Sequence, residues 1–151
     1  MGEPIRLLDV NVLVALSVDV HVHHAQAHAA LIGFSAGWAT CPLTEAALLR
    51  LLLNPASTGR RVGGAEAMEV MRGIRAQPSW QFVDDTSSLA QPHIDTTPLV
   101  GGKQVTDFHL VNLAAENGML LATFDSRISG ALASGDRRHV ELIGASGSAL
   151  P

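Results

Sequence analysis

Four acidic residues stand where apolar segments end or begin, positions from which carboxylates could share a divalent metal. Asp9 closes the mostly apolar run 5–8, and Asp125 follows the run 119–124. Glu45 and Asp107 each follow a threonine and open an apolar helical pattern. Ligand sets made only of oxygen favour hard cations such as Mg²⁺ or Mn²⁺ over zinc. If the fold gathers these acids, they could support metal-assisted chemistry on phosphate esters.

Two of these acids are expected in the first turns of helices, on the side that faces the core. Thr106 is a good N-cap residue, and apolar residues follow Asp107 at the third, fourth and seventh positions. Glu45 repeats this arrangement after Thr44. A favourable interaction with the helix dipole, of ~0.3–1 kcal/mol, would explain either acid alone. The two acids at strand ends favour a shared site instead.

The elements that must position the acids alternate along the chain. Short apolar runs predict strands at residues 6–9, 38–41, 80–83, 120–124 and 140–143. Helical patterns cover residues 23–32, 45–53, 64–76 and 107–117. This alternation predicts an α/β fold with a mostly parallel central sheet. In such a sheet, strand ends and helix starts meet at one edge, so we expect all four acids there.

The remaining segments indicate a single domain. Residues 54–63 and 93–104 are rich in glycine, proline and polar residues, which predicts irregular loops. Gly118 stands where a left-handed residue would end the fourth helix. At 151 residues the chain is long enough for one domain, expected over residues 1–143. The Gly/Ser/Ala-rich segment 144–151 is expected to be a frayed tail.

Composition excludes several classes of protein. No stretch approaches the ~20 apolar residues of a membrane span, and the single Cys41 cannot form an internal disulfide, so a cytoplasmic location is expected. The net charge is −4, with 14 acids against 10 lysines and arginines. The chain without the four acids is therefore neutral, and contacts with nucleic acid must be local. Glycine-rich phosphate loops and the serine-hydrolase elbow are both missing.

The segments around the four acids resemble one nuclease family. They read Leu7-Leu8-Asp9-Val10-Asn11, Trp38-Ala39-Thr40-Cys41-Pro42-Leu43-Thr44-Glu45, Thr106-Asp107 and Leu121-Ala122-Thr123-Phe124-Asp125. Their order and spacing are similar to those of PIN-domain ribonucleases, and above all of the VapC-type toxins of bacterial toxin–antitoxin pairs. The resemblance covers roughly residues 5–143. It implies a PIN-like three-layer sandwich, in which helices flank a mostly parallel sheet.

The resemblance also implies an activity, a metal and partners. The expected activity is a Mg²⁺-dependent endoribonuclease (Mn²⁺ serving as well) whose metal-binding, catalytic acids are Asp9, Glu45, Asp107 and Asp125. Asn11 and Thr123 are the expected supports, because they can hydrogen-bond the carboxylates or metal-bound water. The implied partners are an RNA substrate, a second copy of the chain in a homodimer, and a VapB-type antitoxin that covers the acidic groove.

Basic residues offer weaker indications. Candidates for contacts with RNA phosphates are Arg50, Arg60, Arg61 and Arg127, although exposure or an ion pair would explain each one singly. Four of the seven histidines lie within residues 21–28. His24 and His28, spaced i and i+4, could hold zinc on a helix face. Because no third ligand is evident nearby, a solvated helix is the better interpretation of this cluster.

Two alternatives to an active nuclease stay open. The first is a PIN-like module that binds RNA or protein without catalysis. The second is a phosphatase of the haloacid dehalogenase kind, with Asp9 as nucleophile and Lys103 as phosphate partner. Those enzymes begin with an Asp-x-Asp motif, whereas Asn11 occupies the second acidic position here, which removes the expected general acid.

Overall fold

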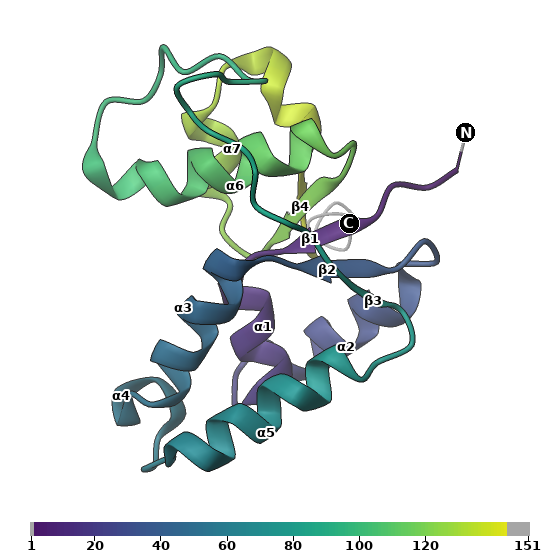
Figure 1. Ribbon diagram of the computed structural model, residues 1–151, viewed down its shortest axis with the longest axis vertical. Coiled ribbons are helices and arrows are strands. Elements are labelled where there is room, and N and C mark those ends of the chain that lie inside the picture. The colour runs from purple at the N-terminus through teal and green to yellow at the C-terminus, as the bar shows by residue number, and fades with distance from the viewer. Residues whose placement is uncertain (1, 145–151) are drawn as a thin grey trace, which may run out of the picture.

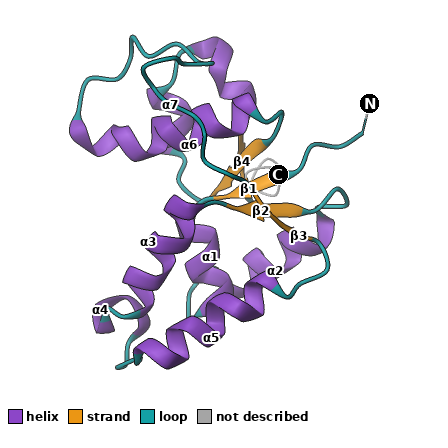
Figure 2. Cartoon of the chain, viewed as in Figure 1, coloured by secondary structure: helices purple, strands orange, loops and turns teal. Residues whose placement is uncertain are grey.

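Five short strands form one sheet in which every neighbouring pair is parallel (Figure 2). In the computed structural model, which describes residues 2–144, the strands are β1 (Arg6–Leu8), β2 (Trp38–Thr40), β3 (Trp80–Phe82), β4 (Leu120–Thr123) and β5 (Val140–Leu142). Their order across the sheet is β3-β2-β1-β4-β5. All five predicted strands are confirmed, and each ends one residue earlier than its apolar run.

Helices cover both faces of this sheet (Figure 1). One face carries α1 (Val10–Ser17), α2 (His24–Gly33), α3 (Pro42–Leu52) and α5 (Gly64–Arg75), with the short α4 (Pro55–Thr58) following α3. The other face carries α6 (Val105–Glu116) and α7 (Arg127–Ala131). Two 3₁₀ turns, η1 (Gly102–Gln104) and η2 (Ser134–His139), complete the described elements.

The core consists of two layers separated by the sheet. Successive residues of a strand point to opposite faces, so neighbouring leucines of β1 enter different layers. Leu8 packs in the layer that includes Leu13 of α1. Leu7 packs in the layer that includes Phe108 of α6. The three-layer sandwich expected from the PIN resemblance is therefore confirmed.

Helix α1 was not predicted, because its sequence is apolar on every side. Residues 10–16 read V-N-V-L-V-A-L, which shows neither a strand alternation nor a clear helical stripe. The helix is buried between the sheet and the other helices, and Val12, Leu13 and Ala15 are fully inaccessible. Asp9 begins it by accepting the backbone N–H of Val10 at 2.7 Å. Burial and this cap override the weak helix preference of valine.

The predicted starts of α3 and α6 and one predicted loop differ from the structure, whereas α5 begins at the predicted Gly64. Helix α3 begins at Pro42, three residues before the predicted start, because proline suits the first helical position and the Thr44 hydroxyl accepts the N–H of Cys41. Helix α6 begins at Val105, so Thr106 is not its N-cap. The predicted loop 54–63 contains α4, which Asn54 caps by accepting the N–H of Ala56.

The long connection from β3 to α6 is irregular, as predicted for residues 93–104 apart from η1, but it is held in place. The fully buried Asn112 of α6 accepts the backbone N–H of His93 at 2.7 Å. His109 contacts Asp85 at 2.6 Å at the start of the same connection. Gly118, with a φ of 66°, ends α6 in the predicted left-handed conformation.

Two predictions concern the extent of the chain and its relation to membranes. Apart from Gly144, the predicted tail 144–151 lies outside the described residues. Within residues 2–144, no helix is both long and apolar enough to cross a bilayer.

Candidate active site

Asp9 lies at the carboxyl end of the central strand and is almost fully enclosed. Its residue is 5% exposed, and its backbone N–H donates to the carbonyl of Ala122 in β4. One carboxylate oxygen caps α1, and the other accepts the Thr123 hydroxyl at 2.7 Å. Burial raises the pKa of Asp9, and the charge of Asp125 adds to this effect against the hydrogen bonds from Thr123 and Val10.

Asn11 and Thr123 connect the start of α1 to the end of β4. The Asn11 amide donates to the Thr123 hydroxyl at 3.0 Å and to the Asp9 carboxylate at 3.3 Å. Its carbonyl oxygen accepts the backbone N–H of Phe124 at 3.1 Å. The two residues that the PIN resemblance implied as supports therefore contact Asp9 directly. Together they fix the orientation of its carboxylate.

Asp125 lies two residues after the end of β4 and is paired with an arginine. Both of its oxygens accept from Arg127, whose Nε and Nη2 atoms lie 3.0 Å from them. This pairing holds the pKa of Asp125 below its ordinary value. The Arg127 side chain is 89% exposed, so it can exchange this carboxylate for another anion at small cost.

Asp107 completes a group of three mutually interacting acids. It stands in the first turn of α6 and is half-buried. Burial raises the pKa of Asp107 to about 6, with further contributions from the charges of Asp9 and Asp125 that outweigh the opposing charge of Arg127. The charges of Asp9 and Asp125 therefore act on Asp107, which agrees with the shared edge expected from the strand-end rule.

Glu45 is paired with a different arginine. One of its oxygens accepts the Thr40 hydroxyl at 2.6 Å, and Arg75 of α5 donates to both oxygens at 3.0–3.1 Å. The guanidinium of Arg75 lies over the rings of Trp80 (4.4 Å) and Phe82 (4.8 Å) on β3. Glu45 therefore belongs to an arginine–aromatic cluster beside the three aspartates.

The four acids thus reach the same edge but do not form one closed ligand set. Within residues 2–144, no three His, Cys, Asp or Glu side chains come close enough together to enclose a metal ion. Two of these acids bond to arginines instead, Asp125 to Arg127 and Glu45 to Arg75. Oxygen-only donors and an acid with a raised pKa still fit a hard divalent cation, which would relieve that repulsion.

The four arginines predicted to contact RNA lie in different surroundings. Of the four candidates only Arg127 touches a site acid. Arg50 is exposed on α3, and Arg60 pairs with Glu66. Arg60 and Arg61 follow α4, beyond the end of α3 that is remote from Glu45. An apolar hollow of about 460 Å³ between α1, α2 and α5 is bordered by none of the four acids.

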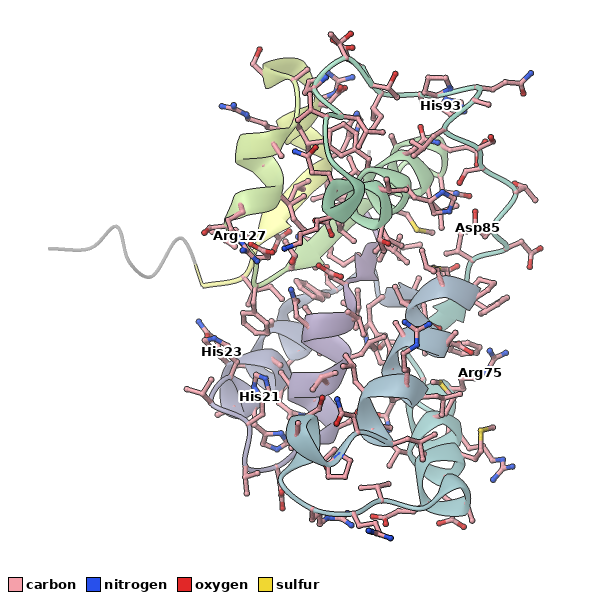
Figure 3. All side chains as sticks on the ribbon, turned by 90° about the vertical axis from the view of Figure 1, so that its left-hand side faces the viewer. His21, His23, Arg75, Asp85, His93 and Arg127 are labelled. Atoms are coloured by element: carbon pink, nitrogen blue, oxygen red, sulfur yellow. The ribbon has the colours of Figure 1, made fainter. Side chains whose placement is uncertain are left out.

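We call the edge of the sheet at which the parallel strands end, and which carries the four acids, the acidic edge. Figure 3 is viewed from that side and labels Arg75, Arg127 and His23, whose contacts near the acids the sequence did not predict. Arg75 lies toward one side of the edge, whereas Arg127 and His23 lie toward the other. Arg75 is 30 residues from Glu45 in the chain, and no local pattern connects them. The His23 ring stacks on Phe124, at a centroid distance of 4.6 Å, next to the site residues Thr123 and Asp125.

Comparison with known proteins agrees with this geometry. No family model matches the chain. It is 42% identical over 144 residues to ribonuclease VapC38 of Mycobacterium tuberculosis, covering 91% of this chain and 96% of that one. It is also 37% identical to ribonucleases VapC29 (82% of this chain, 87% of the relative) and VapC39 (85% and 94%) of the same organism.

Two solved structures share the fold. The crystal structure of Mycobacterium tuberculosis VapC20, described as a sarcin–ricin loop cleaving toxin, superposes with a TM-score of 0.59 at 16% identity, covering 83% of this chain and 94% of that one. PAE2754 from Pyrobaculum aerophilum superposes with a TM-score of 0.56 at 19% identity, covering 85% and 80%.

The parallel sheet, its flanking helices and the acids at its carboxyl edge define a PIN-domain protein. With 37–42% identity over most of the length of several relatives, the chain belongs to the VapC family of ribonucleases, the toxins of toxin–antitoxin pairs. These relatives give the phosphatase alternative no support, and Lys103 lies exposed in η1.

Proposed function

We propose that this VapC ribonuclease is a Mg²⁺-dependent endoribonuclease whose site is built on Asp9, Asp107 and Asp125. The observation that carries the proposal is that Asp9 and Asp125 follow the neighbouring strands β1 and β4 and both bond to Thr123. Burial, and then the charges of these two acids, raise the pKa of Asp107 to about 6. Carboxylates that repel one another in this way form a site of stored electrostatic strain, and a divalent cation is the natural partner for it. Mn²⁺ would fit the same oxygen ligands.

Each residue then has a defined task. Asp9 is the rigid ligand, because Thr123 and Asn11 hold its carboxylate. Asp107 is the proton-sensitive ligand, so that cation and proton compete for its carboxylate below pH 6. Asp125 would be a further ligand of the cation, and Arg127, released from this pairing, could then contact an RNA phosphate. A bound Mg²⁺ supplies Lewis acidity toward the phosphate and toward the attacking water.

Glu45 is proposed as an outer ligand rather than a member of the central set. Its carboxylate bonds to Thr40 and Arg75, which supports a role outside the central set. A role through water-mediated contacts is consistent with that position. This assignment predicts that Glu45→Gln lowers cleavage less than Asp9→Asn does.

The test is cleavage of total RNA by the purified protein, with mapping of the new ends. We expect cleavage with Mg²⁺ or Mn²⁺, 5′-phosphate and 3′-hydroxyl ends, and loss of activity in Asp9→Asn and Asp107→Asn. Asp19→Asn, which neutralises an exposed acid of the loop after α1, is the matched control and should cleave normally. Cleavage that persists in excess chelator would reject the metal mechanism. Absence of both cleavage and metal binding would favour an inactive RNA- or protein-binding module.

We also propose the partners that VapC toxins have in general, namely a VapB-type antitoxin and a second copy of the chain, acting in the cytoplasm. An antitoxin that covers the acidic edge would find two exposed arginines, Arg75 and Arg127, at its sides. Co-expression with the product of the neighbouring gene should suppress cleavage and give a stable complex. Light scattering of the isolated protein would show whether it is a dimer, and a monomer at micromolar concentration would reject that part.

A further inference from the structure

The histidines of residues 21–28 fall into two groups with different surroundings. His24 contacts the carbonyl of Ala15 at 2.8 Å, and His28 contacts that of Leu16 at 3.3 Å. These carbonyls lie at the end of α1, where backbone acceptors lack helical partners. The two rings meet edge to face at 4.5 Å. His24 and His28 therefore join α2 to α1, and their role is structural.

His23 instead contacts Phe124, the neighbour of Asp125, and His21 contacts His23. The His23 ring lies parallel to that of Phe124, with an interplanar angle of 13°. The His21 ring lies 5.8 Å from His23 on a tilted plane, and its Nδ1 accepts the backbone N–H of His23. We call these three rings the ring stack. Such distances are those of favourable aromatic contacts.

The ring stack is fixed to the catalytic group. Phe124 stands between Thr123 and Asp125, and its backbone N–H donates to Asn11, which also bonds to Asp9. The ring of His23 is oriented by a contact of its Nδ1 with Gln26 at 3.1 Å. The position of the rings relative to the acids is therefore set by hydrogen bonds rather than by loose surface packing.

The three residues that carry these rings are partly accessible to solvent. His21, His23 and Phe124 are each half-buried, in contrast to core aromatics such as Phe108, which is 1% exposed. The flexible guanidinium of Arg127 lies on the same side of the acidic edge (Figure 3). Partly exposed rings with a nearby cation are the combination that binds single-stranded nucleic acid, through base stacking and phosphate contacts.

We propose that the ring stack binds an unpaired RNA base adjacent to the phosphate cleaved at the acidic edge. This inference rests on the proposed function and adds a subsite to it. Because Phe124 is the direct neighbour of Asp125, a base on the stack and the scissile phosphate belong to adjoining nucleotides. A base inside a duplex is already stacked and paired, so the substrate is a single-stranded segment whose base can turn outward.

The experiment is a stacking measurement with a short single-stranded oligoribonucleotide that carries the fluorescent base analogue 2-aminopurine at each position in turn. Chelator prevents cleavage, and quenching of the fluorescence reports stacking directly. Wild type should quench at one position. His23→Ala should lose that quenching and bind about 5- to 150-fold more weakly, which corresponds to the ~1–3 kcal/mol of one base stack. His23→Tyr, which keeps an aromatic ring, should retain most of the quenching and most of the binding affinity.

Controls separate stacking from folding. His28→Ala removes a neighbouring ring of α2 and should quench and bind like wild type. Phe124→Leu keeps an apolar side chain without a ring and should behave like His23→Ala. The same oligoribonucleotide annealed to its complement should show no quenching beyond that of the free duplex. With Mg²⁺, His23→Ala should raise KM more than it lowers kcat.

The outcomes distinguish the inference from the function on which it rests. If wild type cleaves RNA but His23→Ala quenches, binds and cleaves as wild type does, the ring stack is structural and the inference is overturned. Equal quenching by the duplex would also overturn it. If wild type cleaves no RNA under any metal condition, the proposed function fails and the subsite fails with it.

Discussion

Neutralising Asp107 should stabilise the metal-free protein while abolishing cleavage. The pKa of this carboxyl is about 6 in the folded protein, against an ordinary value of 3.8. The folded state therefore binds the Asp107 proton more tightly than the unfolded chain does. It follows that the free energy of unfolding falls as the pH rises from about 4 to about 6 and stays low above that. Asp107→Asn removes this loss because the amide carries no charge at any pH.

The size of the gain follows from the same pKa difference. At about 1.4 kcal/mol for each pKa unit, the full effect would be about 3 kcal/mol. Asp107 is only half-buried, and solvent screens its interactions with Asp9 and Asp125, so we expect ~1–2 kcal/mol. For a chain of this length, that gain corresponds to a rise in Tm of about 2–8 °C.

The assay is urea unfolding of wild type and Asp107→Asn in chelator, at pH 4 and pH 8. The variant should be more stable at pH 8, and the difference should vanish toward pH 4. Asp95→Asn is the control, because hydrogen bonds from Thr97 lower the pKa of Asp95 and its neutralisation should give no gain at pH 8. Excess Mn²⁺ should reverse the order, since it stabilises only the protein that binds it.

One result would refute the reasoning. If Asp107→Asn is no more stable than wild type at pH 8, or gains as much at pH 4, the three acids do not repel one another in the folded protein. The unfolding experiment in Mn²⁺ is independent of that outcome, because it tests whether Asp107 is a metal ligand rather than whether the three carboxylates repel one another.

Further changes test other contacts. Asn11→Ala should lower the free energy of unfolding by ~1–3 kcal/mol, because it leaves buried polar partners unsatisfied. It should also lower kcat, and an unchanged kcat would show that the hydrogen bonds from Asn11 to β4 are not needed for activity. Arg75→Met should tighten Mn²⁺ binding, measured by calorimetry, because it releases Glu45; Arg72→Met on the same helix is the control. Weaker Mn²⁺ binding by Arg75→Met would mean that Arg75 positions Glu45. Asn112→Ala should cost ~1–3 kcal/mol and speed proteolysis of the long β3–α6 connection, and equal proteolysis rates would contradict this.

The strands and the meeting of the aspartates could be predicted because both follow from short-range rules. Apolar runs of four or five residues bounded by polar ones have the length of buried parallel strands. Once the order of strands and helices is known, their carboxyl ends must share an edge. Asp9 and Asp125 therefore follow the parallel neighbours β1 and β4 at the same edge of the sheet, as the topology requires.

The structural features that the sequence did not predict depend on interactions between distant parts of the chain. Helix α1 exists because it is buried on all sides, which its own sequence does not reveal. The orientation of Glu45 depends on Arg75, and the two share no spacing that a helix or strand would impose. The stacking of His23 on Phe124 joins residues 101 positions apart, as their numbers show. Contacts of this kind become visible only in three dimensions.

The tie between Asp9 and Thr123 also bears on how such a protein can be made at all. The two residues are 114 positions apart, and β1 obtains its neighbour β4 only when that late segment exists. At ~5–20 residues per second, roughly 6 to 23 s of synthesis separate them on the ribosome. Throughout that interval the nascent chain carries Asp9 without the strand that orients it. A cell can therefore translate most of this ribonuclease before the growing chain is able to form the contacts that orient Asp9.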